Sequence, residues 1–99
     1  MKSQQEFETI YLRLEELWNG PLTQIRYGTF TEVEKTAIEE TLNSIQFDPD
    51  ELLPRKIVTC LWFMPQFMEW QVERITPVQE YKNFCLWVSD KMGEILGNP

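Results

Sequence analysis

Apolar residues recur at steps of three and four positions between residues 7 and 18, the spacing of one face of an α-helix. They are Phe7, Ile10, Tyr11, Leu14, Leu17 and Trp18. Ahead of them, Ser3 and Glu6 have the spacing of a capping box, in which each side chain accepts a hydrogen bond from the other residue's backbone. Behind them, Asn19-Gly20-Pro21 is typical of a helix end. The pattern predicts a first helix between Ser3 and Gly20.

Residues 21–30 show no helical period, and they predict an extended connector. We expect its apolar residues to pack into the core; they are Ile25, Tyr27 and Phe30. A second capping box, Thr31 with Glu34, predicts the start of a second helix. The apolar stripe of this helix is narrow, and its other faces carry glutamates. The stripe consists of Val33, Ala37, Ile38, Leu42 and Ile45.

Two later segments also carry signals for a helix start. Asp48 followed by Pro49 is typical of an N-cap with proline at the first helical position, and it predicts a short helical turn through Leu52 and Leu53. Pro54 then either restarts the helix or bends the chain. Thr76-Pro77-Val78-Gln79 repeats the signal and predicts a last helix, which Gly97-Asn98-Pro99 closes. The apolar side of that helix holds Val78, Tyr81, Cys85, Val88, Met92 and Ile95, with Phe84 and Trp87 beside it.

The segment from Ile57 to Ile75 holds more bulky apolar residues than one face of a helix can bury. On a helical wheel its core stripe is Ile57, Leu61, Met64, Met68, Val72 and Ile75, bordered by Cys60 and Phe67. Trp62 points into the polar wedge opposite this stripe. Trp70 lies at the edge of the wedge, near Phe63. Those three rings are therefore not explained by burial in an ordinary core.

Pro65 complicates this interpretation, because a proline inside a helix removes a backbone donor and either costs about 3 kcal/mol or bends the helix. A strand over residues 56–64 is the alternative, since several of those residues favour β structure. Its only plausible partner is the segment 24–30. The sequence predicts an all-α fold, a single domain over residues 1–99 with four to five helices and one extended connector. The alternative is an α+β fold with a two-stranded element from 24–30 and 56–64.

Two surfaces are candidates for binding another protein. The first is aromatic, because tryptophan and other aromatic residues carry much of the energy at interfaces. Its residues are Trp62, Phe63, Phe67 and Trp70. The competing interpretation is that these rings belong to the core of the bundle. The two interpretations of these rings are compatible if two copies of the chain form a homodimer and share a core.

The second candidate surface is acidic. The net charge is −7, and residues 32–51 hold seven acids against Lys35 alone, a balance of −6. Such a field repels nucleic acid and anionic membrane surfaces, which makes both poor partners. It favours an acidic inhibitor or immunity-type protein that binds a basic partner. Its residues are Glu32, Glu39, Glu40, Asp48, Asp50 and Glu51. A solvated helix face with acidic helix starts is the structural alternative.

The sequence offers no motif for catalysis. It contains no histidine, so the commonest general base and metal ligand is absent. Cys60 and Cys85 lack the spacing of a zinc site, and we expect both to be buried, inert thiols. No apolar stretch approaches the length that spans a bilayer, and we expect a cytoplasmic protein with no catalytic, cofactor-binding or metal-binding residues.

The preferred interpretation is a noncatalytic adaptor, regulator or assembly factor that binds one protein through the aromatic segment, either alone or as a homodimer. The acidic inhibitor remains the alternative. Ionic strength separates the two, because binding through an acidic surface weakens with added salt and aromatic burial does not.

Overall fold

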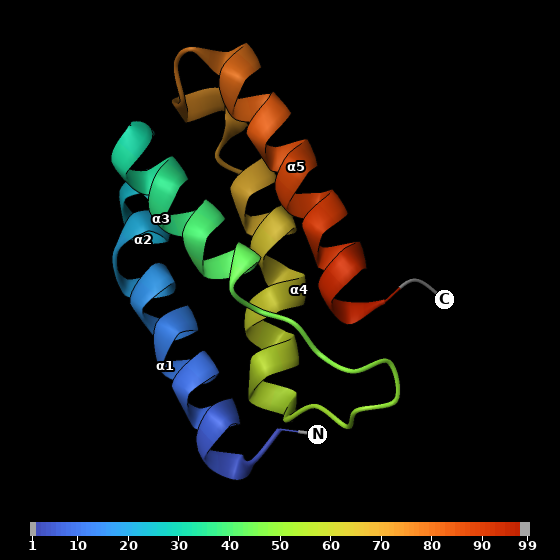
Figure 1. Cartoon of the computed structure of the whole chain (residues 1–99). Coiled ribbons are helices and arrows are strands. Elements are labelled where there is room, and N and C mark those ends of the chain that lie inside the picture. The colour runs from blue at the N-terminus through green and yellow to red at the C-terminus, as the bar shows by residue number, and fades with distance from the viewer. Residues whose placement is uncertain (1, 98–99) are drawn as a thin grey trace.

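The computed structural model describes residues 2–97 and contains five α-helices and one short 3-10 helix in that range (Figure 1). The elements are α1 (Gln4–Asn19), α2 (Pro21–Arg26), α3 (Glu32–Asn43), α4 (Arg55–Glu69), η1 (Val72–Arg74) and α5 (Val78–Leu96). None of residues 2–97 lies in a strand, so the all-α prediction is confirmed. The two-stranded alternative is wrong. Residues 56–64 lie inside α4, where Ile57, Leu61 and Met64 are all buried at helical spacing.

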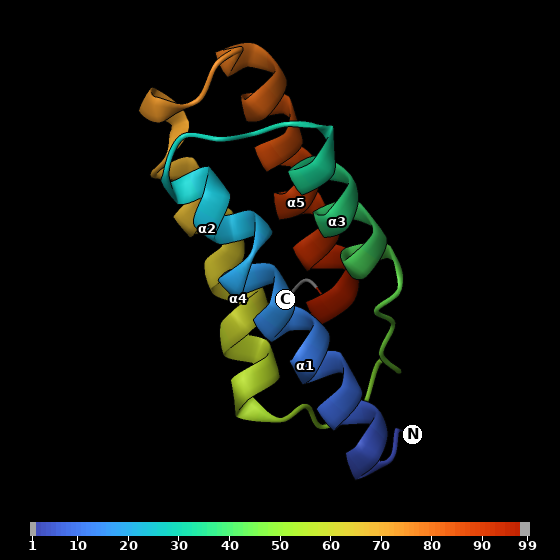
Figure 2. The same cartoon turned by 90° about the vertical axis from the view of Figure 1, so that its left-hand side faces the viewer.

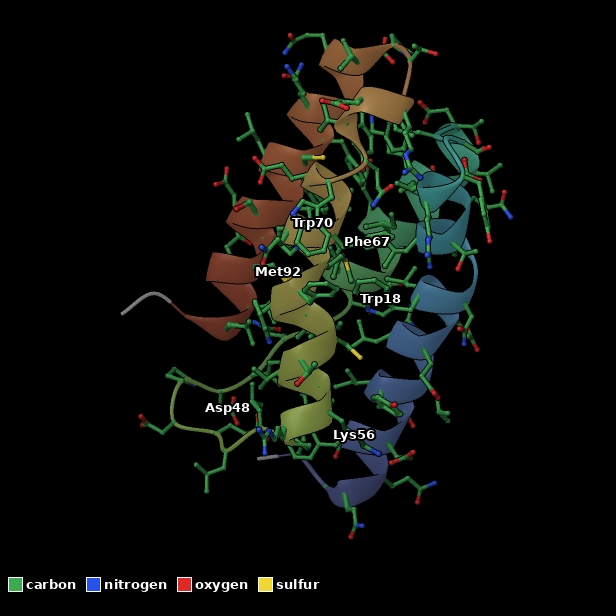
Figure 3. The ribbon with its side chains drawn as sticks, turned by 180° about the vertical axis from the view of Figure 1, so that it is seen from behind. Trp18, Asp48, Lys56, Phe67, Trp70 and Met92 are labelled. Atoms are coloured by element: carbon green, nitrogen blue, oxygen red, sulfur yellow. The ribbon has the colours of Figure 1, made fainter. Side chains whose placement is uncertain are left out.

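Helix α4 occupies a central position and packs against both α1 and α5. Figures 1 and 2 show α1 and α4 running in one direction, and α3 and α5 in the opposite direction. Helix α3 lies on the side of the molecule away from the outer face of α4. A loop from Ser44 to Pro54 then leads the chain to the start of α4. This topology leaves one long face of α4 and the adjoining side of α5 uncovered (Figure 3).

The predicted apolar stripes meet in one core. Each long helix contributes its buried positions, with Leu14 and Leu17 from α1, Ile38 and Leu42 from α3, and Tyr81, Phe84, Val88, Met92 and Ile95 from α5. From α4 come Ile57, Leu61, Met64 and Met68, as the wheel predicted. Val33 and Val78 were expected in these stripes but lie exposed in the first turns of their helices. In α3, Glu34 takes the buried place because it completes the cap with Thr31.

The predicted extended connector over 21–30 is wrong, because residues 21–26 form α2. Pro21 begins α2 at the first helical position, where its missing N–H is not needed. Gly28 ends it with a φ of 93°, and the N–H groups of Gly28 and Thr29 donate to the carbonyls of Ile25 and Gln24. This is the hydrogen-bond pattern of a Schellman motif. Ile25 is buried as expected, whereas Tyr27 is 76% exposed.

Phe30, the last residue of the predicted connector, does reach the core. Its ring lies edge-on to Tyr81, with centroids 5.0 Å apart, and 5.4 Å from Phe84. The chain between Tyr27 and Thr31 is therefore what remains of the connector, and it places Phe30 between α3 and α5.

Both capping boxes are present, at Ser3 with Glu6 and at Thr31 with Glu34. The other two predicted starts differ from expectation. The segment 45–54 contains no helix; only a turn forms, in which the Asp48 N–H donates to the Glu51 carboxylate. Leu52 is 89% exposed, so no packing supports a helix there.

The last helix begins one residue later than predicted, at Val78. Pro77 is its N-cap and no side chain caps it, so Thr76 does not fill the predicted role. At the other end Gly97 caps the helix. The remaining residues of the predicted closing signal, Asn98 and Pro99, lie outside the described residues.

Candidate functional site

Three aromatic side chains form the most conspicuous exposed apolar feature of α4. Trp62 is 53% exposed and Trp70, just after the helix, is 60% exposed. Phe63 lies between them and contacts both rings edge-on, with centroid distances of 5.9 Å to Trp62 and 5.5 Å to Trp70. We call Trp62, Phe63 and Trp70 the aromatic surface. The wheel placed these three residues outside the core stripe, and the structure does the same.

The aromatic surface is supported from behind by α1. Trp18 stacks on Phe63 with centroids 5.8 Å apart and an angle of 17° between the rings. It also meets Phe67 edge-on at 5.0 Å, and its indole N–H donates to the Cys60 carbonyl at 3.2 Å. Figure 3 shows Trp70, Phe67 and Trp18 following one another from the end of α4 to α1. Phe67, predicted as part of the binding surface, is partly buried against the core and supports the surface from within.

Helix α4 continues through Pro65 to Glu69. Pro65 has no N–H to donate to the Leu61 carbonyl, but the helix does not end there, so one wheel describes both of its halves. The far end of α4 is fixed by Tyr81 of α5, whose buried hydroxyl donates to the Met68 carbonyl at 2.6 Å. That bond holds the backbone two residues before Trp70.

A groove of about 700 Å³ continues from Trp70 across to α5. Its lining residues are Pro65, Glu69, Trp70, Val72, Glu73, Lys82, Cys85, Leu86 and Ser89. We call this the α4/α5 groove. Trp70 and Leu86, which is 66% exposed, are its most prominent apolar residues. Through Trp70 the groove is continuous with the aromatic surface.

The two cysteines are both half-buried, and Cys85 lines the α4/α5 groove. Burial raises the pKa of Cys85 to about 11 and also raises the pKa of Cys60. A thiol with a raised pKa remains protonated at neutral pH and is a poor nucleophile and metal ligand. The expectation of full burial is wrong for both cysteines, whereas their raised pKa values agree with the expectation that they are inert.

The six predicted acidic residues do not form one surface. Glu32 and Glu39 line a pocket between α3 and α5, whereas Glu40 lies beside Arg13, Glu16 and Pro21 on another side of α3. Asp48, Asp50 and Glu51 belong to the loop between α3 and α4.

Glu51 also has a structural role in that loop. Its carboxylate accepts hydrogen bonds from the backbone N–H groups of Lys2 and Asp48, which ties the loop to the start of the chain. This carboxylate is partly occupied by the fold itself and is less available to a partner than its exposed neighbours.

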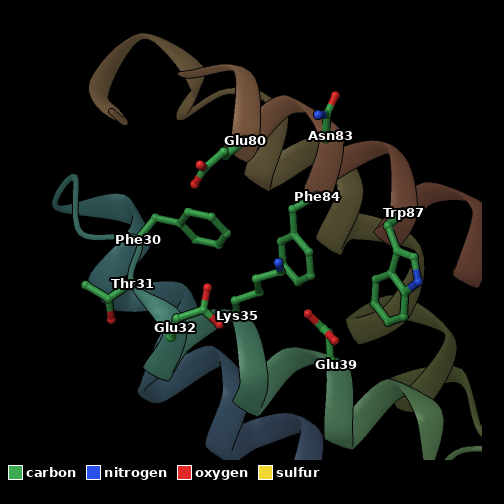
Figure 4. A pocket seen from close by; sticks show the side chains of 9 residues that line it. All are labelled: Phe30, Thr31, Glu32, Lys35, Glu39, Glu80, Asn83, Phe84 and Trp87. Carbon is green, nitrogen blue, oxygen red and sulfur yellow. The ribbon is translucent and has the colours of Figure 1, made fainter. Parts of the chain in front are cut away.

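The pocket that holds Glu32 and Glu39 has a volume of about 450 Å³ (Figure 4). Glu80 of α5 adds a third carboxylate, and Lys35 lies among them. Its aromatic residues are Phe30, Phe84 and Trp87, of which Phe84 and Trp87 are stacked with centroids 5.6 Å apart. We call this the acidic pocket. With three carboxylates and one lysine, its formal charge is −2.

Among residues 2–97 there is no group of three or more His, Cys, Asp or Glu side chains placed to hold a metal ion. Within the same range, no helix combines the length and the apolar character needed to cross a membrane. Comparisons of the chain with models of protein families, with curated proteins and with solved structures find no match.

Sequence reasoning missed two parts of these sites. It placed Trp18 in the core stripe of α1, and only the packing of α1 on α4 shows that Trp18 supports Phe63. It also overlooked the α5 side of the groove, although a signal was present. Lys82, Cys85, Leu86 and Ser89 follow the three- and four-residue spacing of one helix face, which is distinct from the buried face.

Proposed function

We propose that this chain is a noncatalytic adaptor, regulator or assembly factor that binds another protein through the aromatic surface. The observation that carries the proposal is that Trp62 and Trp70 are each more than half exposed on the same face of the molecule. Clustered exposed apolar groups mark interaction sites, and tryptophan is the residue type most enriched at binding hot spots.

The side chains of the aromatic surface are held in place by their neighbours, which supports the same function. Phe63 contacts both tryptophans and rests on Trp18, which is itself hydrogen-bonded to α4. A surface that is already ordered loses little side-chain entropy when a partner covers it, so more of the burial energy remains as affinity.

The test is capture of binding proteins from a lysate of the source cells by the tagged, purified chain. Trp62→Ala and Trp70→Ala should each remove a protein that the unchanged chain retains. Tyr27→Ala is the matched control, because Tyr27 is an aromatic residue that is 76% exposed outside the aromatic surface. If the Tyr27 variant loses the same protein, or both tryptophan variants retain it, the aromatic surface is not the binding site.

A second candidate function is inhibition or immunity by binding a basic protein, and the acidic pocket favours it. Glu32, Glu39 and Glu80 surround Phe30, Phe84 and Trp87 there. Carboxylates beside aromatic rings suit the guanidinium or ammonium group of a partner's side chain, which they attract by charge and by cation–π contact.

The structure supplies a matched pair to test this candidate. Glu39 lines the acidic pocket and its neighbour Glu40 does not. Glu39→Gln should weaken capture of a basic protein, while Glu40→Gln should not. Raising the ionic strength from roughly 0.01 M to roughly 0.15 M shortens the Debye length from about 30 Å to about 8 Å and should release that protein. Equal effects of the two variants, or retention at the higher salt, would exclude this function.

A further inference from the structure

Helices α3 and α5 run side by side in the same direction, but each packs mainly on other elements (Figure 1). Helix α3 packs on α1 and α2, and α5 packs on α4 and η1. The acidic pocket lies between α3 and α5 near the start of both helices. Figure 4 shows the side chains of the two helices pointing toward one another across this pocket. The facing sides of α3 and α5 are therefore separated by a hollow at this point.

A second hollow follows the acidic pocket along the same two helices. It has a volume of about 330 Å³, and its lining residues are Asn43 of α3, the loop residues 45–47, and Lys91, Glu94 and Ile95 of α5. Asn43 comes one helical turn after Glu39, and Lys91 comes one turn after Trp87, so the two hollows are consecutive. We call the acidic pocket and this second hollow together the α3/α5 seam. Since α3 has 12 residues, the seam is about 18 Å long.

The two ends of the α3/α5 seam differ in charge. In the second hollow, Lys91 and Glu94 form an ion pair of 3.1 Å and neutralise each other. The acidic pocket has a formal charge of −2. Lys35 lies among its three carboxylates, but within residues 2–97 none of them is joined to it by an ion pair or accepts a hydrogen bond from the fold. These carboxylates are therefore available to a cation from outside.

The acidic end of the seam is also its aromatic end. The half-buried Trp87 stacks on Phe84 with an angle of 8° between the rings, and Phe30 lies 5.4 Å from Phe84. Arginine and lysine side chains combine an apolar stem with a charged head, and both bind to aromatic faces. A basic side chain thus meets aromatic rings and unpaired carboxylates in the same place.

We infer that the α3/α5 seam binds a basic segment of a partner protein, with an arginine or lysine side chain in the acidic pocket and less polar residues along the second hollow. Charge decides the occupant. Residues 32–51, which include α3, have a balance of −6, so this side of the molecule attracts a basic segment and repels an acidic one. The inference rests on the second function proposed above. It adds that the partner contributes a segment and that the contact continues beyond the acidic pocket.

The probe is a fluorescently labelled synthetic peptide of about 12 residues, which spans the seam if it is helical. Arginines occupy one half of the peptide, and leucine and serine occupy the remaining positions. Fluorescence anisotropy at an ionic strength of roughly 0.1 M should show that the purified chain binds this peptide and does not bind a version with glutamate in place of arginine. The arginine-containing half alone should bind about tenfold more weakly, because it leaves the second hollow empty.

Two neighbouring glutamates of α3 provide variants with the same change of charge. Glu39→Lys should weaken binding of the whole peptide about tenfold or more, because it places a cation in the acidic pocket. Glu40→Lys makes the same change on another side of α3 and should weaken binding less than about threefold. Glu39 is preferred to Glu32 and Glu80, since those two lie in first helical turns, where an acid also stabilises the helix.

Lysine variants test the same pocket from the opposite direction. Lys35→Gln removes the cation that lies among the carboxylates and should strengthen binding of the peptide. Lys82→Gln makes an equal change of charge in the α4/α5 groove, outside the seam, and should have a smaller effect. Far-UV circular dichroism checks that every variant is folded.

Four results would overturn the inference: no binding of the arginine peptide, equal binding of the glutamate peptide, equal effects of Glu39→Lys and Glu40→Lys, or equally tight binding of the arginine-containing half. These failures are distinct from failure of the second proposed function. If the half peptide binds as tightly as the whole, a captured basic protein that Glu39→Gln loses still supports that function. If the peptides and variants behave as expected but no basic protein is captured from the lysate, the seam remains a binding site and the proposed function fails.

Discussion

Tyr81 joins α5 to the end of α4 and thereby positions Trp70 and the α4/α5 groove. Its side chain is fully buried, and its hydroxyl donates to the Met68 carbonyl at 2.6 Å. Tyr81→Phe deletes this bond and keeps the ring contact with Phe30 at 5.0 Å. The substitution therefore removes the hydrogen bond between the two helices, together with the contact of the hydroxyl with the Cys85 thiol on α5 itself.

The expected loss follows from what remains at the Met68 carbonyl. That oxygen also accepts from the Gln71 N–H at 3.0 Å, so it stays hydrogen-bonded in the variant. The cost is therefore the ordinary net value of a buried hydrogen bond, about 1 kcal/mol, and not the larger penalty of an unpaired buried carbonyl. For a chain of this size, such a change lowers the melting temperature by about 4–8 °C.

The pH dependence gives a second signature. Burial raises the pKa of Tyr81 above its ordinary value of 10.0, so the folded chain keeps this proton at pH values where the unfolded chain loses it. The contribution is complete below pH 10 and declines above it, by up to about 1.4 kcal/mol per pH unit. Tyr81→Phe cannot lose this proton, and its stability should fall less steeply.

Urea unfolding at pH 7 and in steps above pH 10, followed by circular dichroism, measures both effects. Equal free energies of unfolding at pH 7 would show that the hydroxyl does not couple α4 to α5. Equal slopes above pH 10 would show that Tyr81 is not shielded from solvent. Either result would refute the account of how the end of α4 is fixed.

Three further changes test the local structure around the bundle. Gly28→Ala should lower the free energy of unfolding by about 1–3 kcal/mol, because φ at Gly28 is 93° and an added Cβ would lie 3.2 Å from the Arg74 carbonyl oxygen. A urea midpoint like that of the unchanged chain would contradict this. Thr31→Ala should destabilise the chain by about 1–2 kcal/mol, more than Ser3→Ala in the exposed box, because it frees the buried Glu34 carboxylate from a 2.6 Å hydrogen bond. The reverse order in thermal melts would show that burial does not strengthen the cap. Burial raises the pKa of Cys85 from 9.0 to about 11, so its contribution to stability is present below pH 9 and declines from pH 9 to 11. Cys85→Ala should make the decline in the free energy of unfolding less steep in urea titrations. An unchanged decline would show that other groups cause it.

Local signals predicted the parts of the fold that local chemistry decides. The two boxes at Ser3 and Thr31 act within four residues of sequence, and both form as expected. The same kind of signal failed at Asp48, where the turn forms but no helix follows. A capping signal starts a helix only when apolar residues behind it find a core, and Leu52 does not.

Helix α2 was missed for the opposite reason. Its six residues are too few to show a helical period. Pro21 at its start and Gly28 beyond its end are nevertheless typical signals of a helix start and a helix end. Those two residues were assigned to the end of α1 and to a connector. Tertiary packing then buried Leu22 and Ile25 and made the short helix stable.

Only the part of the candidate site that depends on a single helix was predictable from the sequence. The exposure of Trp62 and Trp70 follows from helical geometry alone, once α4 continues through Pro65. The support from Trp18 and the α5 side of the groove depend on which helices pack together, and a wheel of one helix carries no such information. For the same reason, the acidic residues that looked like one surface in sequence lie on three parts of the fold.

The most direct test of the central claim is the dissociation constant of Trp62→Ala for the captured protein, measured together with its free energy of unfolding. The exposed 53% of a side chain of about 250 Å² is roughly 130 Å², and its burial at about 25 cal/mol per Å² contributes about 3 kcal/mol to binding.

The account predicts that the affinity falls about 100-fold, while the variant unfolds cooperatively with most of its stability retained. An unchanged affinity, or loss of binding only because the variant unfolds, would contradict it and assign Trp62 to the packing of the bundle.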